Sequence, residues 1–190
     1  MKPVFILSYP RSRTAWLSVF LTGCGIPCIH EGWKYAKTAQ ELRVLMESMG
    51  TGSVVNSDCS NIFFLDELKQ EFPEARYIVI LNDDQAVVES LKQSYGDQDY
   101  TELVAAYRRA YRDLDVAPSM VLDCRTWSPI ESVRLAHCIG GVVPPKWWVE
   151  SCSGFLVQLM PDQIQRDIDL AHMGAVGHIH EHMRRFTWVS

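Results

Sequence analysis

Short apolar segments alternate along the chain with amphipathic segments of helical period, and this alternation limits the folds open to it. The clearest apolar segment is Arg76–Leu81, RYIVIL, a continuous run of β-favouring residues. Continuous apolar runs of this length are typical of strands that are covered on both faces. Four further segments have strand character, namely Val4–Leu7, Pro27–His30, Gly52–Ser57 and Ser119–Cys124.

The segments between these strands carry helix-start signals. Thr38 with Glu41, and Ser128 with Glu131, match the capping box, and Pro129 occupies the first helical position of the second box. Helices are expected at about 14–23, 38–49, 61–71, 83–91, 100–114 and 128–140, with one more at about 162–172. Strands and helices in this order predict an α/β domain of three layers, α/β/α, with a mainly parallel sheet.

Length and composition fit one globular domain. The 190 residues contain no linker or repeat, so we expect a single domain over 1–190, with a core at about 2–160 and a helical extension at 161–190. The apolar fraction of 47% argues against disorder. The net charge of −5 disfavours non-specific nucleic-acid binding, so no nucleic-acid partner is expected.

Two features favour a cytoplasmic protein without a membrane partner. The N-terminal apolar run is cut by Pro10, is too short to span a bilayer and lacks the layout of a signal peptide. The cysteines form no Cys-x-x-Cys pair, so reduced, buried thiols are expected. They are Cys24, Cys28, Cys59, Cys124, Cys138 and Cys152.

The loop after the first strand has the residue types of an anion site. The sequence SYPRSRT, Ser8–Thr14, leads from the strand directly into a helix. Ligands of open parallel sheets bind beyond the carboxyl ends of the strands, and a helix N-terminus offers free N–H groups to an anion. Arg11 and Arg13 add charge, and Ser12 and Thr14 add hydroxyl groups. The alternative is a tight turn with two solvated arginines.

This loop is not a Walker A sequence, because it has no lysine and no glycine between Ser8 and Thr14. It resembles instead the 5′-phosphosulfate-binding loop of sulfotransferases, which typically reads Tyr-Pro-Lys-Ser-Gly-Thr-Thr-Trp. The matching residues are Tyr9, Pro10, Ser12, Thr14 and Trp16. The departures are Arg11 for lysine, Arg13 for glycine and Ala15 for threonine.

A second segment, FPEARYIVILNDDQAVVESL, follows the plan of the same family. There, an arginine after the strand and a serine eight residues later hold the 3′-phosphate of the donor, 3′-phosphoadenosine 5′-phosphosulfate (PAPS). Ser90 matches that serine, whereas Asn82 stands in place of the arginine and Asp84 in place of the next proline. A late GGVVPPKWW is similar to the family's Gly-Val-Pro turn, so the resemblance spans roughly residues 2–159.

The resemblance implies a P-loop nucleoside-triphosphate-hydrolase-like fold and transfer of a sulfuryl group from PAPS to a hydroxyl or amine of a small molecule or saccharide. It implies no metal. Arg11 would contact the bridging and leaving-group oxygens. The implied donor site comprises Tyr9, Pro10, Arg11, Ser12, Arg13, Thr14, Ala15, Asn82 and Ser90.

The acceptor needs a base, and three residues at strand ends are candidates. Asp58 follows the third strand, about where the family often has a catalytic histidine, and is the first choice. His30 and Glu31 follow the second strand and are the other choices. Asp58 could instead cap a turn, and His30 could be a structural histidine.

Two other functions remain open. A nucleotide or metabolite kinase with a modified phosphate loop would bind ATP with magnesium, although the Walker lysine is absent. A non-catalytic nucleotide-binding relative would keep the fold and lose turnover, as Asn82 and Arg13 favour. The sequence does not specify the acceptor or the oligomeric state.

Three further groups of residues have a structural and a functional interpretation. His178 and His182 have a spacing that can bind zinc, but a solvated tail is favoured. The indoles of Trp127, Trp147 and Trp148 could line an acceptor pocket or pack in the core. The arginines of one helix could supply charge for a 3′-phosphate, or pair with nearby acids. They are Arg108, Arg109 and Arg112.

Overall fold

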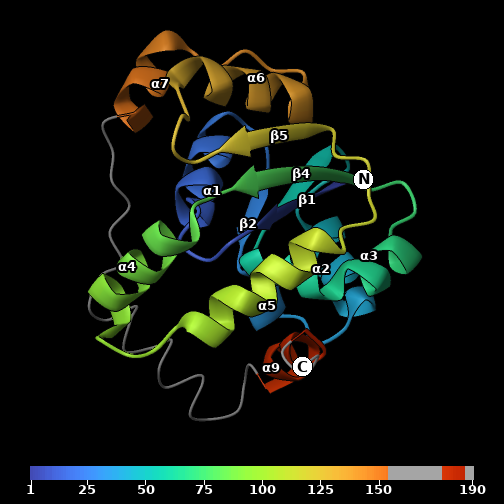
Figure 1. Cartoon of the computed structure of the whole chain (residues 1–190). Helices are drawn as coiled ribbons and strands as arrows, with labels where there is room; N and C mark the ends of the chain where they lie inside the picture. Colours follow the sequence, from blue (N-terminus) through green and yellow to red (C-terminus); the bar gives the residue numbers. More distant parts are fainter. Residues whose placement is uncertain (154–176, 187–190) are drawn as a thin grey trace.

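Five parallel strands form one sheet in the order β2-β3-β1-β4-β5 (Figure 1). The structure is a computed structural model that describes residues 1–153 and 177–186. The strands are β1 (Lys2–Ser8), β2 (Cys28–His30), β3 (Ser53–Ser57), β4 (Arg76–Leu81) and β5 (Met120–Asp123). Because β1 pairs with both β3 and β4, its carboxyl end lies in the middle of the sheet edge where ligands of such folds bind.

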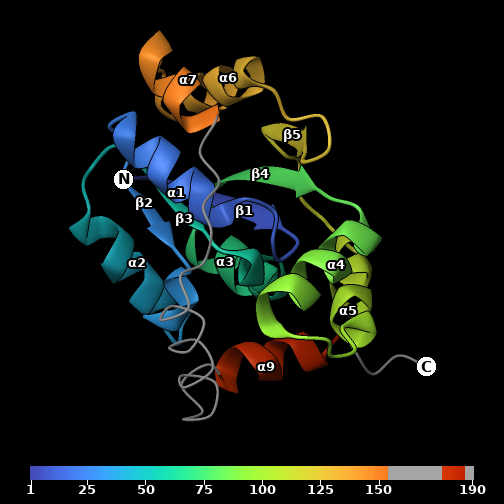
Figure 2. The same ribbon diagram turned by 90° about the vertical axis from the view of Figure 1, so that its left-hand side faces the viewer.

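Helices cover both faces of the sheet. The described helices are α1 (Thr14–Gly23), α2 (Ala39–Ser48), α3 (Leu65–Glu71), α4 (Asp84–Tyr95), α5 (Thr101–Arg112), α6 (Pro129–Gly140), α7 (Lys146–Ser153) and α9 (Gly177–Arg184), with 3-10 turns η1 (Gly32–Lys34) and η2 (Cys59–Phe64). Helices α1, α6 and α7 lie on one side, and α2, α3, α5 and α9 lie on the other (Figures 1 and 2). The predicted three-layer α/β/α architecture is therefore confirmed.

The central strand β1 is apolar from Val4 to Leu7 because helices cover both of its faces. Val4 and Ile6 pack toward α1 and α6, whereas Phe5 and Leu7 pack toward α3 and α5. All four side chains are fully buried. Since successive strand residues face opposite sides, a sheet covered on both faces buries every residue of its middle strand.

The predicted helix caps are largely confirmed. Ser128 and Glu131 form the complete capping box of α6, and the Asp83 carboxylate accepts from the Ala86 N–H at 3.1 Å at the start of α4. Thr38 caps α2 by accepting from the Glu41 N–H. The reciprocal bond is displaced by one residue, because the Glu41 carboxylate accepts from the N–H of Lys37.

One predicted helix is wrong in its first half. Residues 59–64 form the 3-10 turn η2, and only then does α3 begin at Leu65. The Asp58 carboxylate accepts from the Ser60 N–H, which fixes the tight turn, and Ile62, Phe63 and Phe64 are all buried. Apolar residues on every side of a short segment do not distinguish 3-10 from α geometry.

The helix expected at 162–172 lies outside the described residues. Within residues 1–153 and 177–186, the structure contains no helix that is both long and apolar enough to cross a membrane. All six cysteines are free thiols.

Candidate functional site

The loop between β1 and α1 has an unusual backbone. Arg11 and Arg13 adopt left-handed conformations with φ of 63° and 62°. Non-glycine residues rarely occupy this region, and such strain tends to persist where the surrounding structure and function require it. Tyr9 anchors the start of the loop in the core by stacking on Tyr111, with ring centroids 4.9 Å apart.

Free backbone N–H groups gather where this loop becomes α1. Arg13 is the N-cap residue, and its side chain makes no capping hydrogen bond. Its carbonyl accepts from the Leu17 N–H at 2.8 Å, so the helix starts regularly. The N–H groups of the first helical turn have no intrahelical acceptor and carry the positive end of the macrodipole. The loop therefore offers donors suited to an oxyanion.

Side chains tie the loop to the β4–α4 connection. The Arg11 guanidinium donates through Nε to Ser90 Oγ of α4 at 3.1 Å. Asn82 Nδ2 donates to the buried Ser12 Oγ at 3.2 Å, and Asn82 Oδ1 accepts from the Asp83 N–H at 2.9 Å. Asn82 and Ser90 thus hydrogen-bond to the loop itself.

A cavity of about 400 Å³ opens beside the loop. Its walls are Pro10, Arg11, Arg13, Thr14, Ala15, Trp16, His30, Glu31, Cys59, Leu91, Tyr95, Trp127, Ser128, Pro129, Ser132, Cys152 and Ser153. This is the size range of small-molecule sites, and it joins cationic, aromatic and hydroxyl groups.

Most of the predicted site residues meet in this cavity, and some do not. The residues that line it are Pro10, Arg11, Arg13, Thr14, Ala15, His30 and Glu31. The predicted residues outside its lining are Tyr9, Ser12, Asp58, Asn82 and Ser90. Tyr9 and Ser12 are buried behind the loop, so they support its shape.

His30 and Glu31 line the cavity next to Thr14 of the loop. His30 Nε2 lies 3.4 Å from Thr14 Oγ1, and His30 Nδ1 lies 3.9 Å from the Glu31 carboxylate. The same carboxylate pairs with Lys34 at 2.5 Å. An imidazole between a hydroxyl and a carboxylate can accept a proton and be stabilised when charged.

Asp58 has a different place from the one expected of a base. Its side chain is 2% exposed, and its two oxygens accept from the Trp33 N–H at 3.0 Å and the Ser60 N–H at 2.8 Å. Burial raises the pKa of the Asp58 carboxyl, against the lowering effect of these two bonds. His30 and Glu31 line the cavity, whereas Asp58 lies outside its lining and fixes the turns η1 and η2.

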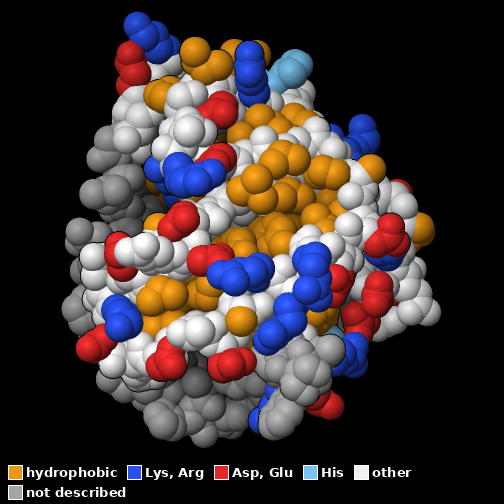
Figure 3. All heavy atoms as spheres, in the orientation of Figure 1, with side chains coloured by type: hydrophobic (Ala, Val, Ile, Leu, Met, Phe, Trp, Pro, Cys, Tyr) orange, Lys and Arg blue, Asp and Glu red, His pale blue; other side chains and the backbone are white. Residues whose placement is uncertain are grey.

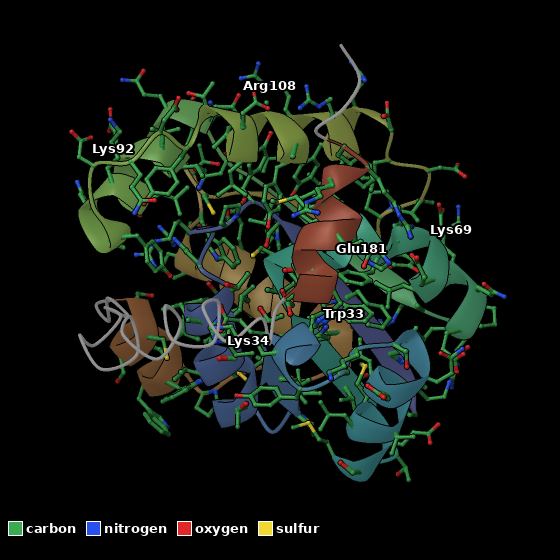
Figure 4. The ribbon with its side chains drawn as sticks, turned by 90° about the horizontal axis from the view of Figure 1, so that it is seen from below. Trp33, Lys34, Lys69, Lys92, Arg108 and Glu181 are labelled. Atoms are coloured by element: carbon green, nitrogen blue, oxygen red, sulfur yellow. The ribbon has the colours of Figure 1, made fainter. Side chains whose placement is uncertain are left out.

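Helix α9 closes the other side of η1. His178 Nε2 lies 2.9 Å from the Trp33 carbonyl, and His182 Nε2 lies 3.0 Å from the Glu67 carboxylate. Figure 4 shows this helix, marked by Glu181, beside Trp33. These contacts dock α9 on η1 and α3, so the favoured interpretation of a solvated tail is wrong. No group of three or more potential metal ligands occurs among residues 1–153 and 177–186.

The remaining tryptophans and arginines have distinct roles. Trp127 lines the cavity, with the Arg13 guanidinium 5.6 Å from its ring centroid. Trp148 donates from its indole N–H to the Phe20 carbonyl at 3.1 Å, and Trp147 is largely exposed. Arg108 pairs with Asp84 and Arg112 with Asp113, as expected for an exposed helix face. Arg109 is partly buried, lies near Glu102 and donates from its guanidinium to the Phe186 carbonyl.

Sequence reasoning missed the far wall of the cavity. Leu91 and Tyr95 lie on α4, Ser132 on α6, and Cys152 on α7. The sequence could have placed the start of α6 at the site. Its capping box follows the parallel strand β5, so it must lie at the same sheet edge as the loop. Burial raises the pKa of the Cys59 thiol to about 12, so this cysteine of the wall is a poor nucleophile near neutral pH.

The backbone strain at Arg13 yields a direct prediction. Arg13→Gly should be more stable than Arg13→Ala by about 1 kcal/mol, because both lose the side chain and only glycine adopts a positive φ without strain. Urea unfolding would measure the difference. Arg108, within the regular helix α5, provides the control. There Arg108→Gly should be less stable than Arg108→Ala, because glycine disfavours a regular helix. Equal stability of the two Arg13 variants would contradict the strain argument.

Comparisons with known proteins give one distant structural likeness. No family model matches the chain, and no curated protein matches it. A solved structure of a gluconokinase from Sinorhizobium meliloti 1021 is similar, at 15% identity and a TM-score of 0.44, over 71% of this chain and 89% of that one. So weak a likeness says nothing about activity. The structure itself defines the class, an α/β/α domain whose central strand–loop–helix connection lies at the middle of the sheet edge.

Proposed function

We propose that the chain is a transferase that moves a sulfuryl group from PAPS to a hydroxyl or amine of a small molecule or saccharide. The observation that carries this proposal is the cavity, in which the loop with Arg11, Arg13 and free N–H groups faces His30 and Glu31. The resemblance of the loop to that of sulfotransferases supports the choice of donor.

In this proposal each wall has one task. The N–H groups at the start of α1 and the Thr14 hydroxyl hold the 5′-phosphate, and Arg11 contacts the bridging and leaving-group oxygens. The hydroxyl oxygen or amine nitrogen of the acceptor attacks sulfur while His30 takes the proton from that atom. The S–O bond to the nucleotide breaks, and the bisphosphate nucleotide leaves. The transition state is loose, so positioning and fixed positive potential supply most of the catalysis.

A specific observation favours phosphoryl transfer as the second candidate. Asn82 and Ser90, which the resemblance assigns to the 3′-phosphate, hydrogen-bond to Ser12 and Arg11 and do not line the cavity. A donor without a 3′-phosphate, such as ATP, would need nothing from these residues. These two hydrogen bonds are equally compatible with a non-catalytic nucleotide-binding protein.

Titration calorimetry with adenosine 3′,5′-bisphosphate, ATP and AMP separates these functions. The sulfotransferase proposal expects the bisphosphate to bind, and labelled PAPS to transfer its sulfuryl group to a panel of phenols, amines and sugars. A preference for ATP that depends on magnesium would replace it with the kinase. Binding of the bisphosphate without transfer would favour the non-catalytic relative, and no binding of any nucleotide would overturn all three.

A further inference from the structure

The ring of His182 in α9 lies between two oxygen atoms. Its Nδ1 lies 3.0 Å from the His178 carbonyl oxygen, and its Nε2 lies 3.0 Å from the Glu67 carboxylate. A carbonyl oxygen and an ionised carboxylate can only accept hydrogen bonds. A neutral imidazole has one N–H and can satisfy one of these oxygens, whereas an imidazolium donates to both. The docked geometry therefore requires a protonated His182.

Glu67 carries its charge in the same arrangement. Burial opposes that charge, yet hydrogen bonds from the Glu67 N–H, from His182 and from Arg185 lower the pKa of the Glu67 carboxyl. Arg185 Nη1 lies 3.2 Å from the same carboxylate oxygen that faces His182. The His182 side chain is 17% exposed, so solvent screens this pair less than a pair on the open surface.

The other charged groups near the ring have partners or balance one another. A cavity of about 230 Å³ beside His182 is also lined by Lys37 and by two acids, Glu67 and Glu71. The Glu71 carboxylate is paired with Arg43 at 2.6 Å. Acidic and basic side chains lie next to one another over the lower part of the molecule in Figure 3, where Figure 1 places α5 and α9. The proton on His182 therefore acts mainly through Glu67.

Helix α9 is connected to the candidate site through η1. His178 Nε2 lies 2.9 Å from the Trp33 carbonyl, a contact that a neutral imidazole can make by donating from Nε2–H. The His182 ring stacks on Phe64, and Phe64 stacks on Trp33, with ring centroids 4.0 and 3.8 Å apart. Trp33 belongs to η1, whose N-cap residue is Glu31 of the cavity. Docking of α9 thus supports the cavity wall.

We propose that His182 is a proton-dependent latch, whose protonation fastens α9 to η2 and α3 and whose deprotonation loosens α9 and the Glu31 side of the cavity. Because the docked geometry uses the proton, docking is strongest on the acid side of an ordinary histidine titration, about pH 6.5, and weakens above it. At low pH, docking weakens again as the pH falls through the lowered pKa of Glu67. Ile179 and Met183 pack on the core at any pH, so the latch changes the degree of docking.

Hydrogen exchange of the α9 amides in the full chain tests the latch, with rates corrected for the intrinsic effect of pH on exchange. An isolated helix of eight residues is not stable in water, so undocking exposes these amides. Their protection should fall about tenfold between about pH 5.5 and about pH 8.5, as expected for the loss of one charged hydrogen bond. Nitrogen-15 NMR should show protons on both ring nitrogens of His182 at about pH 7, where an ordinary histidine is mostly neutral.

Matched variants separate the proton from the fixed charge. His182→Gln has no titrating proton and should abolish the dependence of α9 protection on pH. Arg185→Gln removes a fixed charge from the same carboxylate, so it should lower protection at every pH while the dependence on pH remains. His137→Gln, which removes an exposed histidine of α6, should change neither.

Three results would overturn the latch. One is a neutral His182 at about pH 7 in a chain whose α9 amides are protected. Another is protection of α9 that stays constant with pH in the wild type. The third is a dependence on pH that survives in His182→Gln. None of these measurements involves a nucleotide, so they decide the latch separately from the proposed transferase.

Discussion

Asn61→Ala is expected to lower the free energy of unfolding by about 3–5 kcal/mol, more than any surface substitution in this chain. Asn61 is fully buried, and its amide oxygen accepts from Trp33 Nε1 at 2.9 Å and from Asn56 Nδ2 at 2.8 Å. Its amide nitrogen donates to the carbonyls of Ile6 and Asn56. Alanine would leave two donors buried without acceptors, and a small cavity besides.

Urea and thermal unfolding measure this loss, with a fall in Tm of the order of 10 °C for a chain of this size. Gln85→Ala is the control, because Gln85 is an exposed amide on α4 and its removal should change stability by less than about 0.5 kcal/mol. A loss below about 1 kcal/mol for Asn61→Ala would show that water or rearrangement satisfies the freed groups.

The same network connects the core to the cavity. Gly32 donates from its N–H to Asn56 Oδ1 at 3.1 Å, and Trp33 donates to Asp58 and Asn61. These bonds hold η1, the turn that Glu31 caps in a left-handed conformation with φ of 57°. Since a strained residue persists only where its surroundings fix it, the buried amides are what keep Glu31 and His30 facing the loop.

The sequence was sufficient for the architecture because its signals are local. The central strands β1 and β4 contain continuous apolar runs, and caps such as Ser128 with Glu131 act within four residues. Asp83 likewise caps α4 from one residue before it. The parallel sheet then follows from the alternation of the elements.

The site was only partly predictable because several of its contacts are distant in sequence. Asp58 follows a strand, as a base would, yet its partner at Trp33 lies 25 residues away, and no pattern in the sequence shows that pairing. The sequence shows that Asn82 stands where the resembled family has an arginine. It does not show that Asn82 hydrogen-bonds to Ser12, 70 residues away. Arg11 and Arg13 were predictable as site residues, whereas their left-handed backbone was not.

Arg11→Ala is expected to weaken the binding of adenosine 3′,5′-bisphosphate or ATP about 10- to 100-fold, whichever of them the wild type binds. Charged hydrogen bonds to an anion contribute about 1.5–3 kcal/mol, and each 1.4 kcal/mol is tenfold in affinity. Arg11 lines the cavity, and among the described residues its guanidinium bonds only through Nε, to Ser90, so its terminal nitrogens remain for an oxyanion. Arg11→Lys keeps the charge without the fork and should recover part of the affinity. Calorimetry measures all three proteins.

The control for charge alone is Arg108→Ala, which removes an exposed arginine paired with Asp84 and should leave affinity unchanged. The control for backbone is Arg11→Gly, because alanine at a φ of 63° is strained and glycine is not. If Arg11→Gly binds as weakly as Arg11→Ala, the guanidinium itself holds the anion. If glycine restores wild-type affinity, the shape of the loop and its N–H groups are sufficient, and the role assigned to the Arg11 side chain is wrong.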